Sequence, residues 1–280
     1  MLIVQTIAEL KACLNGEREQ GHSVGLVPTM GALHAGHASL VERSVKENDV
    51  TVVSIFLNPT QFNDKKDLER YPRTLEADCE LLEKCGAQVV FAPSVEEVYP
   101  EPDTRVFSYP PTDSVMEGAF RPGHFNGVCQ IVSKLFDYVE PDRAYFGEKD
   151  YQQICVIRRM VEDLKMDINI VACPVIREES GLARSSRNTL LSDDERQLAA
   201  HIYRVLSESR KKQMSVAETH DFVVSEIDAI EGLKVQYFSI VDGLTLADVS
   251  TWDDAESVVG CITVYCGAVP IRLIDHIRYK

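Results

Sequence analysis

VGLVPTMGALHAGH (residues 24–37) decides the fold, because an apolar strand runs through a short turn directly into a helix. We expect the strand over 24–28, and the apolar residues Leu40, Val41 and Val45 predict a helix over 36–48. The first N–H groups of a helix lack partners and carry a partial positive charge, so they attract anions. Gly36 lets a phosphate come close, and His34 and His37 can donate to it. The stretch therefore predicts a site that handles a nucleotide triphosphate.

Composition narrows the class of protein. A chain of 280 residues with 45% hydrophobic and 26% charged residues is typical of a globular protein with two domains. The net charge of −15 argues against a nucleic-acid partner, which requires a basic face. No apolar run approaches the ~20 residues that span a membrane, and no targeting segment is recognisable, so we expect a cytoplasmic protein. The eight cysteines lack C-x-x-C spacing and are predicted to be reduced thiols.

The alternation of elements predicts an α/β fold with a Rossmann-like parallel sheet. Apolar periodicity gives strands near 24–28, 50–57, 87–91, 142–146 and 168–172, separated by helices near 36–48, 67–84, 126–137 and 150–165. The run from Val50 to Phe56 is apolar on both faces, as in strands covered by helices on both sides. Polar clusters follow three of these strands, at 34–37, 58–62 and 147–150. They are expected to meet at the carboxyl edge of the sheet, where such folds bind nucleotides.

After about residue 175 the alternation of strands and helices gives way to a different pattern. A polar loop over 178–188 leads into a helix that starts at Ser192, where Ser192 and Glu195 fit a capping box. A helix near 215–230 and strands near 234–241, 257–266 and 271–278 follow. We therefore predict two domains: a Rossmann-like nucleotide-binding domain over 1–175 and a smaller α+β lid domain over 176–280.

Six ordered blocks carry a specific resemblance: PTMGALHAGH (28–37), SIFLNPTQF (54–62), YPRTLEAD (71–78), RPGHFNGV (121–128), PDRAYFGEKDYQQ (141–153) and GLARSSRN (181–188). Together they resemble the pantothenate synthetase family, the pantoate–β-alanine ligases, within the nucleotidyltransferase superfamily that carries an H-x-G-H motif. The resemblance implies that ATP and (R)-pantoate give pantoyl adenylate and pyrophosphate. The amine of β-alanine then displaces AMP to form pantothenate, a precursor of coenzyme A. The resemblance also implies that Mg²⁺ accompanies ATP, which is a substrate, and that the protein forms a homodimer.

Attack of a carboxylate on the α-phosphorus builds negative charge on the phosphates, so the chemistry calls for positioned cationic and hydrogen-bond donors. We assign His37, His34, Lys149 and Arg187 as catalytic donors; for the 147–150 turn alone, a solvated charged turn is the competing interpretation. Asp150 favours the helix start and could hold a ribose hydroxyl. With the resemblance, the ATP-binding set is Met30, Gly31, Ala32, Leu33, His34, Ala35, Gly36, His37, Gly147, Glu148, Lys149, Asp150, Ile176, Arg184, Ser185, Ser186 and Arg187.

The resemblance assigns the small substrates to two glutamines. It implies that Gln61 meets pantoate and β-alanine and that Gln153 holds pantoate, with Asn58 accompanying them; a glutamine amide both donates and accepts hydrogen bonds. Asp78 is a candidate outer ligand for Mg²⁺, which takes one or two carboxylates, and a capping or helix-face role is the alternative.

Two positions depart from the family pattern. Ser180 stands where aspartate is common, and Arg184 stands where methionine or leucine is common. Because position 184 is expected to meet adenine through its backbone, we expect ATP binding to survive. Because the loop over 177–188 lies next to the domain boundary, we further expect the lid domain to close over ATP and exclude water from the adenylate.

Two other functions compete with this one. A nucleotidyltransferase that acts on a phosphorylated coenzyme precursor would call for a cation where Gln61 and Gln153 stand. A non-catalytic nucleotide sensor would not require His37, Lys149 and Arg187 to be intact.

Overall fold

The computed structural model describes residues 1–62, 68–69 and 71–280. The chain divides into two compact units: unit 1 comprises Met1–Tyr109, Phe120–Gly147 and Val156–Cys173, and unit 2 comprises Pro110–Ala119, Glu148–Cys155 and Pro174–Lys280. A single boundary near 175 does not anticipate the two earlier segments of unit 2. They belong to it because Arg272 donates to the Glu117 carboxylate (2.7 Å) and the Tyr151 hydroxyl donates to the Gly243 carbonyl (2.8 Å).

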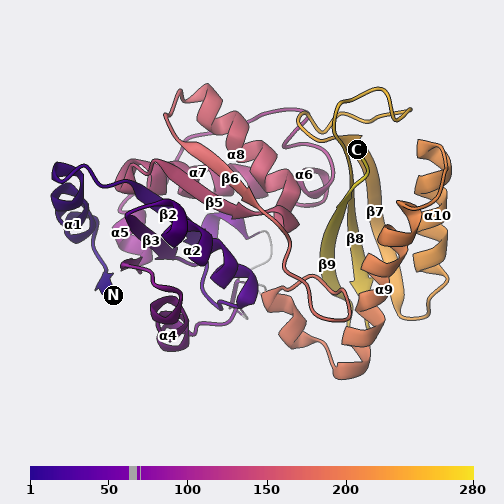
Figure 1. Ribbon diagram of the computed structural model, residues 1–280, viewed down its shortest axis with the longest axis horizontal. Coiled ribbons are helices and arrows are strands. Elements are labelled where there is room, and N and C mark those ends of the chain that lie inside the picture. The colour runs from indigo at the N-terminus through magenta and orange to yellow at the C-terminus, as the bar shows by residue number, and fades with distance from the viewer. Residues whose placement is uncertain (63–67, 70) are drawn as a thin grey trace. The chain divides into compact units, whose positions relative to one another are not determined.

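Six parallel strands form the sheet of unit 1 in the order β1-β4-β3-β2-β5-β6 (Figure 1). Their bounds are Leu2–Val4 for β1, Val24–Thr29 for β2, Val50–Ile55 for β3, Val89–Phe91 for β4, Arg143–Gly147 for β5 and Asn169–Cys173 for β6. The predicted Rossmann-like parallel sheet is confirmed. The sequence pattern does not predict β1, in which only Val4 is buried.

The carboxyl end of β2 lies at the point where the order of the strands reverses. The chain passes from β2 to β3 and β4 on one side, and β5 pairs with β2 on the other side. In open α/β sheets, ligands bind outside the carboxyl ends of the strands at such a point. The turn that follows β2 is therefore placed where the fold offers a binding crevice.

Helices of unit 1 connect these strands. Their bounds are Ile7–Glu19 for α1, Ala35–Glu47 for α2, Leu75–Cys85 for α4, Val95–Val98 for α5 and His124–Val139 for α7, while α8 (Tyr151–Asp163) continues into unit 1 from residue 156. The helix expected over 67–84 begins at Leu75, and positions 67 and 70 lie outside the described residues. The sequence pattern does not predict helix α1, in which only Leu10 and Leu14 are buried.

Helix α2 packs tightly onto β2 at Gly25. A Cβ atom built there would stand 2.3 Å from Ser44 Oγ and 2.5 Å from Asn48 Nδ2, so no larger residue fits without moving the helix. Farther along, Val27, Val41, Val53 and Val90 belong to one buried apolar cluster. The first turn of α2 is thus held at a fixed place relative to the end of β2.

Unit 2 is built on an antiparallel sheet in the order β7-β8-β9 (Figure 1). The strands are Leu233–Asp242, Val258–Cys266 and Ile271–Arg278, and helices α9 (Asp193–Ser209) and α10 (Val216–Asp228) pack on them around one apolar core. The short elements are α6 (Glu117–Phe120, which ends in unit 1), η2 (Glu148–Asp150) and η3 (Ser186–Leu190). The predicted capping box is confirmed: Ser192 Oγ accepts from Glu195 N (3.3 Å), and Glu195 accepts from Ser192 N (2.9 Å).

All eight cysteines are free thiols, five of them buried and three half-buried. No helix within the described parts of the chain has the length and apolar character needed to cross a membrane.

Candidate active site

The turn after β2 is held by a buried carboxylate. Gly31 and Ala32 both have positive φ (+83° and +52°), a conformation that glycine adopts readily and alanine does not. Asp78 on α4, 3% exposed, accepts from Ala32 N (3.0 Å), Leu33 N (2.8 Å) and the Thr74 hydroxyl (3.2 Å). Both of its oxygens are engaged, so the structure gives Asp78 the task of fixing the turn; the Mg²⁺ assignment finds no support in its contacts.

Two histidines cap helix α2. His34 is the N-cap residue, and its Nδ1 accepts from Gly36 N (3.0 Å), while Nδ1 of His37 accepts from His34 N (3.3 Å). The ring centroids stand 4.2 Å apart. An Nδ1 that accepts a hydrogen bond carries no proton, so the neutral ring carries its proton on Nε2. Both rings are therefore set as Nε2–H donors.

Gly36 has to be glycine for this arrangement. A Cβ atom there would stand 2.7 Å from Cε1 and 2.9 Å from Nδ1 of His34, which would push the ring off the helix start. The first turn of α2, which includes Ala35, contains no acidic side chain. No residue of this turn itself offsets the partial positive charge of the helix N-terminus, which favours an anion there.

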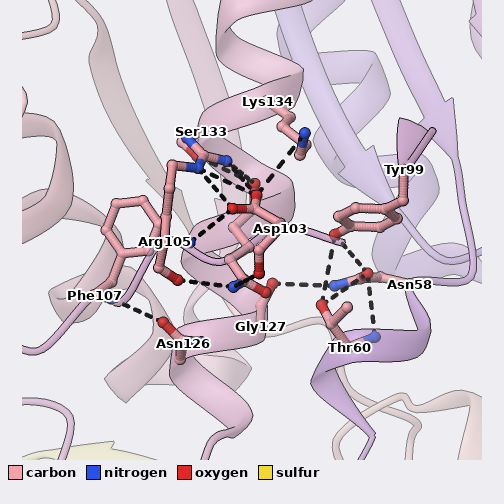
Figure 2. A network of polar contacts seen from close by, with 11 residues as sticks. Asn58, Thr60, Tyr99, Asp103, Arg105, Phe107, Asn126, Gly127, Ser133 and Lys134 are labelled. Carbon is pink, nitrogen blue, oxygen red and sulfur yellow. Dashed lines mark hydrogen bonds and ion pairs between the residues drawn. The ribbon is translucent and has the colours of Figure 1, made fainter. Parts of the chain in front are cut away.

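Asn58 lies at the end of β3, 1% exposed, and its side chain is fully used by the protein. Its Oδ1 accepts from the hydroxyls of Tyr99 (2.9 Å) and Thr60 (3.1 Å), and its Nδ2 donates to Gly127 O (3.0 Å), as Figure 2 shows. Both ends of the Asn58 amide thus have protein partners, which gives this side chain a structural role beside Gln61. The expected contact of Asn58 with the substrate stays a prediction.

Gln61, in the short helix η1 (Pro59–Gln61), meets the end of β2. Its Oε1 accepts from Asn58 Nδ2 (3.2 Å), and its Nε2 donates to Met30 Sδ. The structure thus brings together the predicted ATP-binding residue Met30 and the predicted substrate-binding residue Gln61. Both belong to unit 1.

The sequence analysis assigned no role to His124 or Gly127, although their RPGHFNGV block was recognised. His124, at the start of α7, bonds through Nδ1 to the Gln61 carbonyl (2.9 Å). At Gly127 a Cβ atom would stand 2.4 Å from Thr60 O, so η1 can lie against α7 only over a glycine. These two residues fix the backbone that carries Gln61.

The turn after β5 places the predicted phosphate donor Lys149 in unit 2. Lys149 in η2 is 17% exposed at its side chain, and its Nζ stands 3.6 Å from Asp150 Oδ2. Glu148 stands 3.7 Å from Arg278, and Gly147 ends β5. The first turn of α8 follows directly, with Gln153 half-buried in it.

The loop after β6 folds back on itself within unit 2. Arg184 N donates to Ile176 O (2.9 Å), and Arg177 pairs with Ala183 in an isolated antiparallel bridge. Gly181 turns the loop with a φ of +92°. The backbone of Arg184, rather than its side chain, is therefore what the loop fixes.

Distant side chains anchor this loop. The Arg177 guanidinium donates to both oxygens of Asp275 (2.6 and 2.9 Å) and stacks 3.5 Å from the Tyr203 ring centroid. Asn188, buried in η3, donates to Ala183 O (3.1 Å). Nothing in the local sequence pattern indicates these partners.

A pocket in unit 2 gathers several of the predicted phosphate contacts. Lys149, Ser185 and Arg187 line it together, and Ser185 Oγ accepts from Arg187 N (3.3 Å) at the start of η3, which Ser186 opens. The lining also includes residues that the sequence analysis did not single out: Leu182, Ala183, Asn188, Ala199, Ile202, Tyr203, Arg272, Leu273, Ile274 and Asp275. The pocket thus joins three cationic side chains, Lys149, Arg187 and Arg272, and one carboxylate, Asp275, to hydroxyl and apolar surface, and this excess of positive charge suits a phosphorylated ligand.

Comparison with known proteins matches the whole chain. The family model described as pantoate-beta-alanine ligase matches residues 2–278. Pantothenate synthetase of Bacteroides thetaiotaomicron is 64% identical, over all of this chain and 99% of the relative, and that of Porphyromonas gingivalis is 56% identical over the full length of both.

Solved structures agree with the sequence comparison. The crystal structure of pantothenate synthetase from Thermus thermophilus is 45% identical with a TM-score of 0.93, covering all of this chain and 99% of the other. The pantoate-beta-alanine ligase of Francisella tularensis, solved with beta-gamma ATP and beta-alanine, is 34% identical with a TM-score of 0.83 and covers all of this chain and 98% of the other.

Proposed function

The chain belongs to the pantoate-beta-alanine ligase family, and we propose that it condenses (R)-pantoate with β-alanine to pantothenate at the expense of ATP. In the first step a pantoate carboxylate oxygen bonds to the α-phosphorus, and the bond to pyrophosphate breaks. In the second step the β-alanine nitrogen bonds to the acyl carbon, the bond to AMP breaks and the amine loses a proton. The product serves coenzyme A biosynthesis.

The observation that carries the residue assignment is the capped start of α2. Both Nδ1 atoms accept backbone hydrogen bonds, so His34 and His37 offer Nε2–H groups beside a helix N-terminus without an acidic residue. Charge that develops on phosphate oxygens is stabilised most by donors that are already oriented. We assign His34 and His37 to ATP phosphates as neutral donors, because a proton on Nδ1 would face a backbone N–H and break the caps.

The unit 2 pocket holds other predicted phosphate contacts. Lys149 and Arg187 are assigned to the departing pyrophosphate, and Ser185 and Ser186 add hydroxyl donors. The Arg184 backbone, fixed by its bond to Ile176 O, is assigned to adenine. Arg184 in place of the usual apolar residue then leaves this contact intact.

The two glutamines are assigned to the small substrates. Gln61 stands beside Met30 with its amide held by Asn58, and Gln153 lies in the first turn of α8. Pantoate offers a carboxylate and hydroxyls, and β-alanine offers a carboxylate and an amine, so neutral amides that donate and accept can serve both. A phosphorylated acceptor would require a cation at these positions, and the family comparisons do not favour that alternative.

We further propose that Mg²⁺ enters as MgATP, because within 1–62, 68–69 and 71–280 no group of three or more His, Cys, Asp or Glu side chains is arranged to hold a metal. Mg²⁺ bound to phosphate keeps several waters and needs few protein ligands.

A cytoplasmic location is supported by eight free thiols, which suit a reducing compartment. A homodimer is proposed on the family resemblance, and sedimentation equilibrium tests it.

Exchange of labelled pyrophosphate into ATP tests the function. With Mg²⁺ we expect exchange that requires pantoate, followed by AMP release that requires β-alanine. Exchange without any carboxylate, or exchange supported by a phosphorylated acceptor but not by pantoate, would contradict the proposal.

A further inference from the structure

An extended segment of unit 1 is pinned along helix α7 by side chains four residues apart. Asn126 Oδ1 accepts from Phe107 N (2.8 Å), Gln130 Nε2 donates to the Asp103 carbonyl (3.0 Å), and Lys134 Nζ stands 3.8 Å from Asp103 Oδ2 (Figure 2). Residues spaced by four lie on one face of a helix, so this segment follows α7 over its length. It is therefore ordered, although residues 103–107 form no helix or strand.

Tyr99, just before this segment, turns its hydroxyl toward Asn58 (Figure 2). The hydroxyl donates to Asn58 Oδ1 (2.9 Å), and Lys134 Nζ stands 5.3 Å from the centre of the Tyr99 ring. Burial raises the pKa of Tyr99, so its hydroxyl keeps the proton that it donates. The α7 side chain that holds Asp103 thus also lies over the ring of Tyr99.

The Asn58 amide can take one orientation in this setting. A carbonyl can only accept and a backbone N–H can only donate, so Gly127 O fixes the Nδ2 end and Thr60 N (3.4 Å) fixes the Oδ1 end. The Tyr99 hydroxyl, which can donate or accept, donates to the Oδ1 end fixed in this way and so holds the amide in place. With Nδ2 also donating to Gln61 Oε1 (3.2 Å), the Gln61 oxygen is held against Asn58.

We propose that Tyr99 is a positioning residue for Gln61, acting through the Asn58 amide so that the substrate meets the N–H of Gln61 rather than its oxygen. The inference rests on the proposed role of Gln61. One Nε2–H goes to Met30 Sδ, and the other is directed to an oxygen of the acid substrate, a carboxylate or hydroxyl. The site thereby prefers acceptor groups on its substrates at this point.

Tyr99→Phe tests the proposal, because it removes the hydroxyl and keeps the ring. We expect the KM for pantoate to rise about fivefold, as for the loss of one hydrogen bond, with the KM for ATP unchanged. Tyr138→Phe is the matched control: Tyr138 is also a half-buried tyrosine of unit 1 and packs edge-on against Phe91. It should leave both KM values unchanged.

A double-mutant cycle separates positioning from general damage. In a Gln61→Ala background, Tyr99→Phe should raise the pantoate KM no further, because the residue that it positions is gone. An additive effect would overturn the proposal, as would equal increases in the KM values for ATP and pantoate in the single variant.

The side-chain amide NMR signal of Gln61, identified by its loss in Gln61→Ala, gives a readout that needs no activity. It should shift in Tyr99→Phe and stay in place in Tyr138→Phe. If wild-type protein shows no pantoate-dependent exchange, the proposed function fails while this signal still decides the positioning. An unmoved signal in Tyr99→Phe overturns the positioning alone.

Discussion

Two regions assigned to ATP phosphates are ordered in different ways. In unit 1 the helix start over 34–37 is ordered by near neighbours, since His34, Gly36 and His37 bond one another, and the turn before it takes one distant partner, Asp78. The 176–188 loop of unit 2 is ordered by residues far along the chain, with Arg177 and Asp275 separated by 98 positions. The helix start thus carries its own geometry locally, whereas the loop depends on an anchor that lies outside it.

This contrast has a kinetic consequence. Changes in the first region should remove oriented donors and lower kcat, because the donors act on charge that develops during the reaction. Changes in the anchor of the second region should loosen ATP binding and raise the KM for ATP. The two regions can therefore be told apart by which constant changes.

His37→Ala should have the largest effect. We expect the rate of pantoate-dependent exchange to fall about a hundredfold, the usual cost of removing one oriented donor. His22→Ala is the control, because His22 pairs with Glu17 at a half-exposed position. If the exchange rate of His37→Ala fell less than threefold, the role of His37 as an oriented phosphate donor would be contradicted.

Asp78→Asn should lower the same rate about tenfold. Each oxygen of Asp78 accepts from one backbone N–H group, whereas an asparagine has a single acceptor oxygen. One of the two N–H groups therefore loses its partner, which costs about 1–3 kcal/mol in folding free energy and disturbs the turn. Glu76→Gln on the exposed side of α4 is the control. Recovery of wild-type rate by excess Mg²⁺ would instead assign Asp78 to the metal.

Arg177→Lys should raise the KM for ATP about tenfold and leave kcat near wild type, because a displaced loop mispositions its contacts. Lysine keeps the charge but cannot hold both Asp275 oxygens or stack on Tyr203 in the same way. Trypsin should then cleave faster after Arg184 and Arg187. Equal KM values and cleavage rates in Arg177→Lys and wild type would show that the loop needs no anchor.

The smallest effect is expected in the pH dependence of stability. Burial is the main reason that the pKa of His276 in β9 lies below its ordinary 6.5, so the folded state disfavours its protonation. Below about pH 6.5 the unfolded chain binds a proton that the folded chain does not. The free energy of unfolding therefore decreases as the pH is lowered. Urea unfolding at pH 5.5 and 7.5 should show a smaller pH difference in His276→Gln than in wild type. An identical difference would contradict this contribution of His276.

What the sequence could predict follows the same contrast. The parallel sheet and the position of the start of α2 are visible because the residues that set strand and helix periods lie close together along the chain. The roles of Asp78 and Asn58 are not visible, because the use of a buried polar side chain depends on which backbone groups come near it. The placement of 110–119 and 148–155 in unit 2 likewise depends on distant partners such as Arg272 and Gly243.

The central claim is that the phosphate donors at the start of α2 are oriented before ATP arrives. Nitrogen-15 NMR of the His34 and His37 rings at pH 7.5, without ligand and then with MgATP, tests it most directly. We predict that Nδ1 carries no proton and Nε2 carries one in both states, with MgATP shifting only the Nε2 signals. A proton on Nδ1 in the ligand-free protein, or a change of tautomer on binding, would contradict the account.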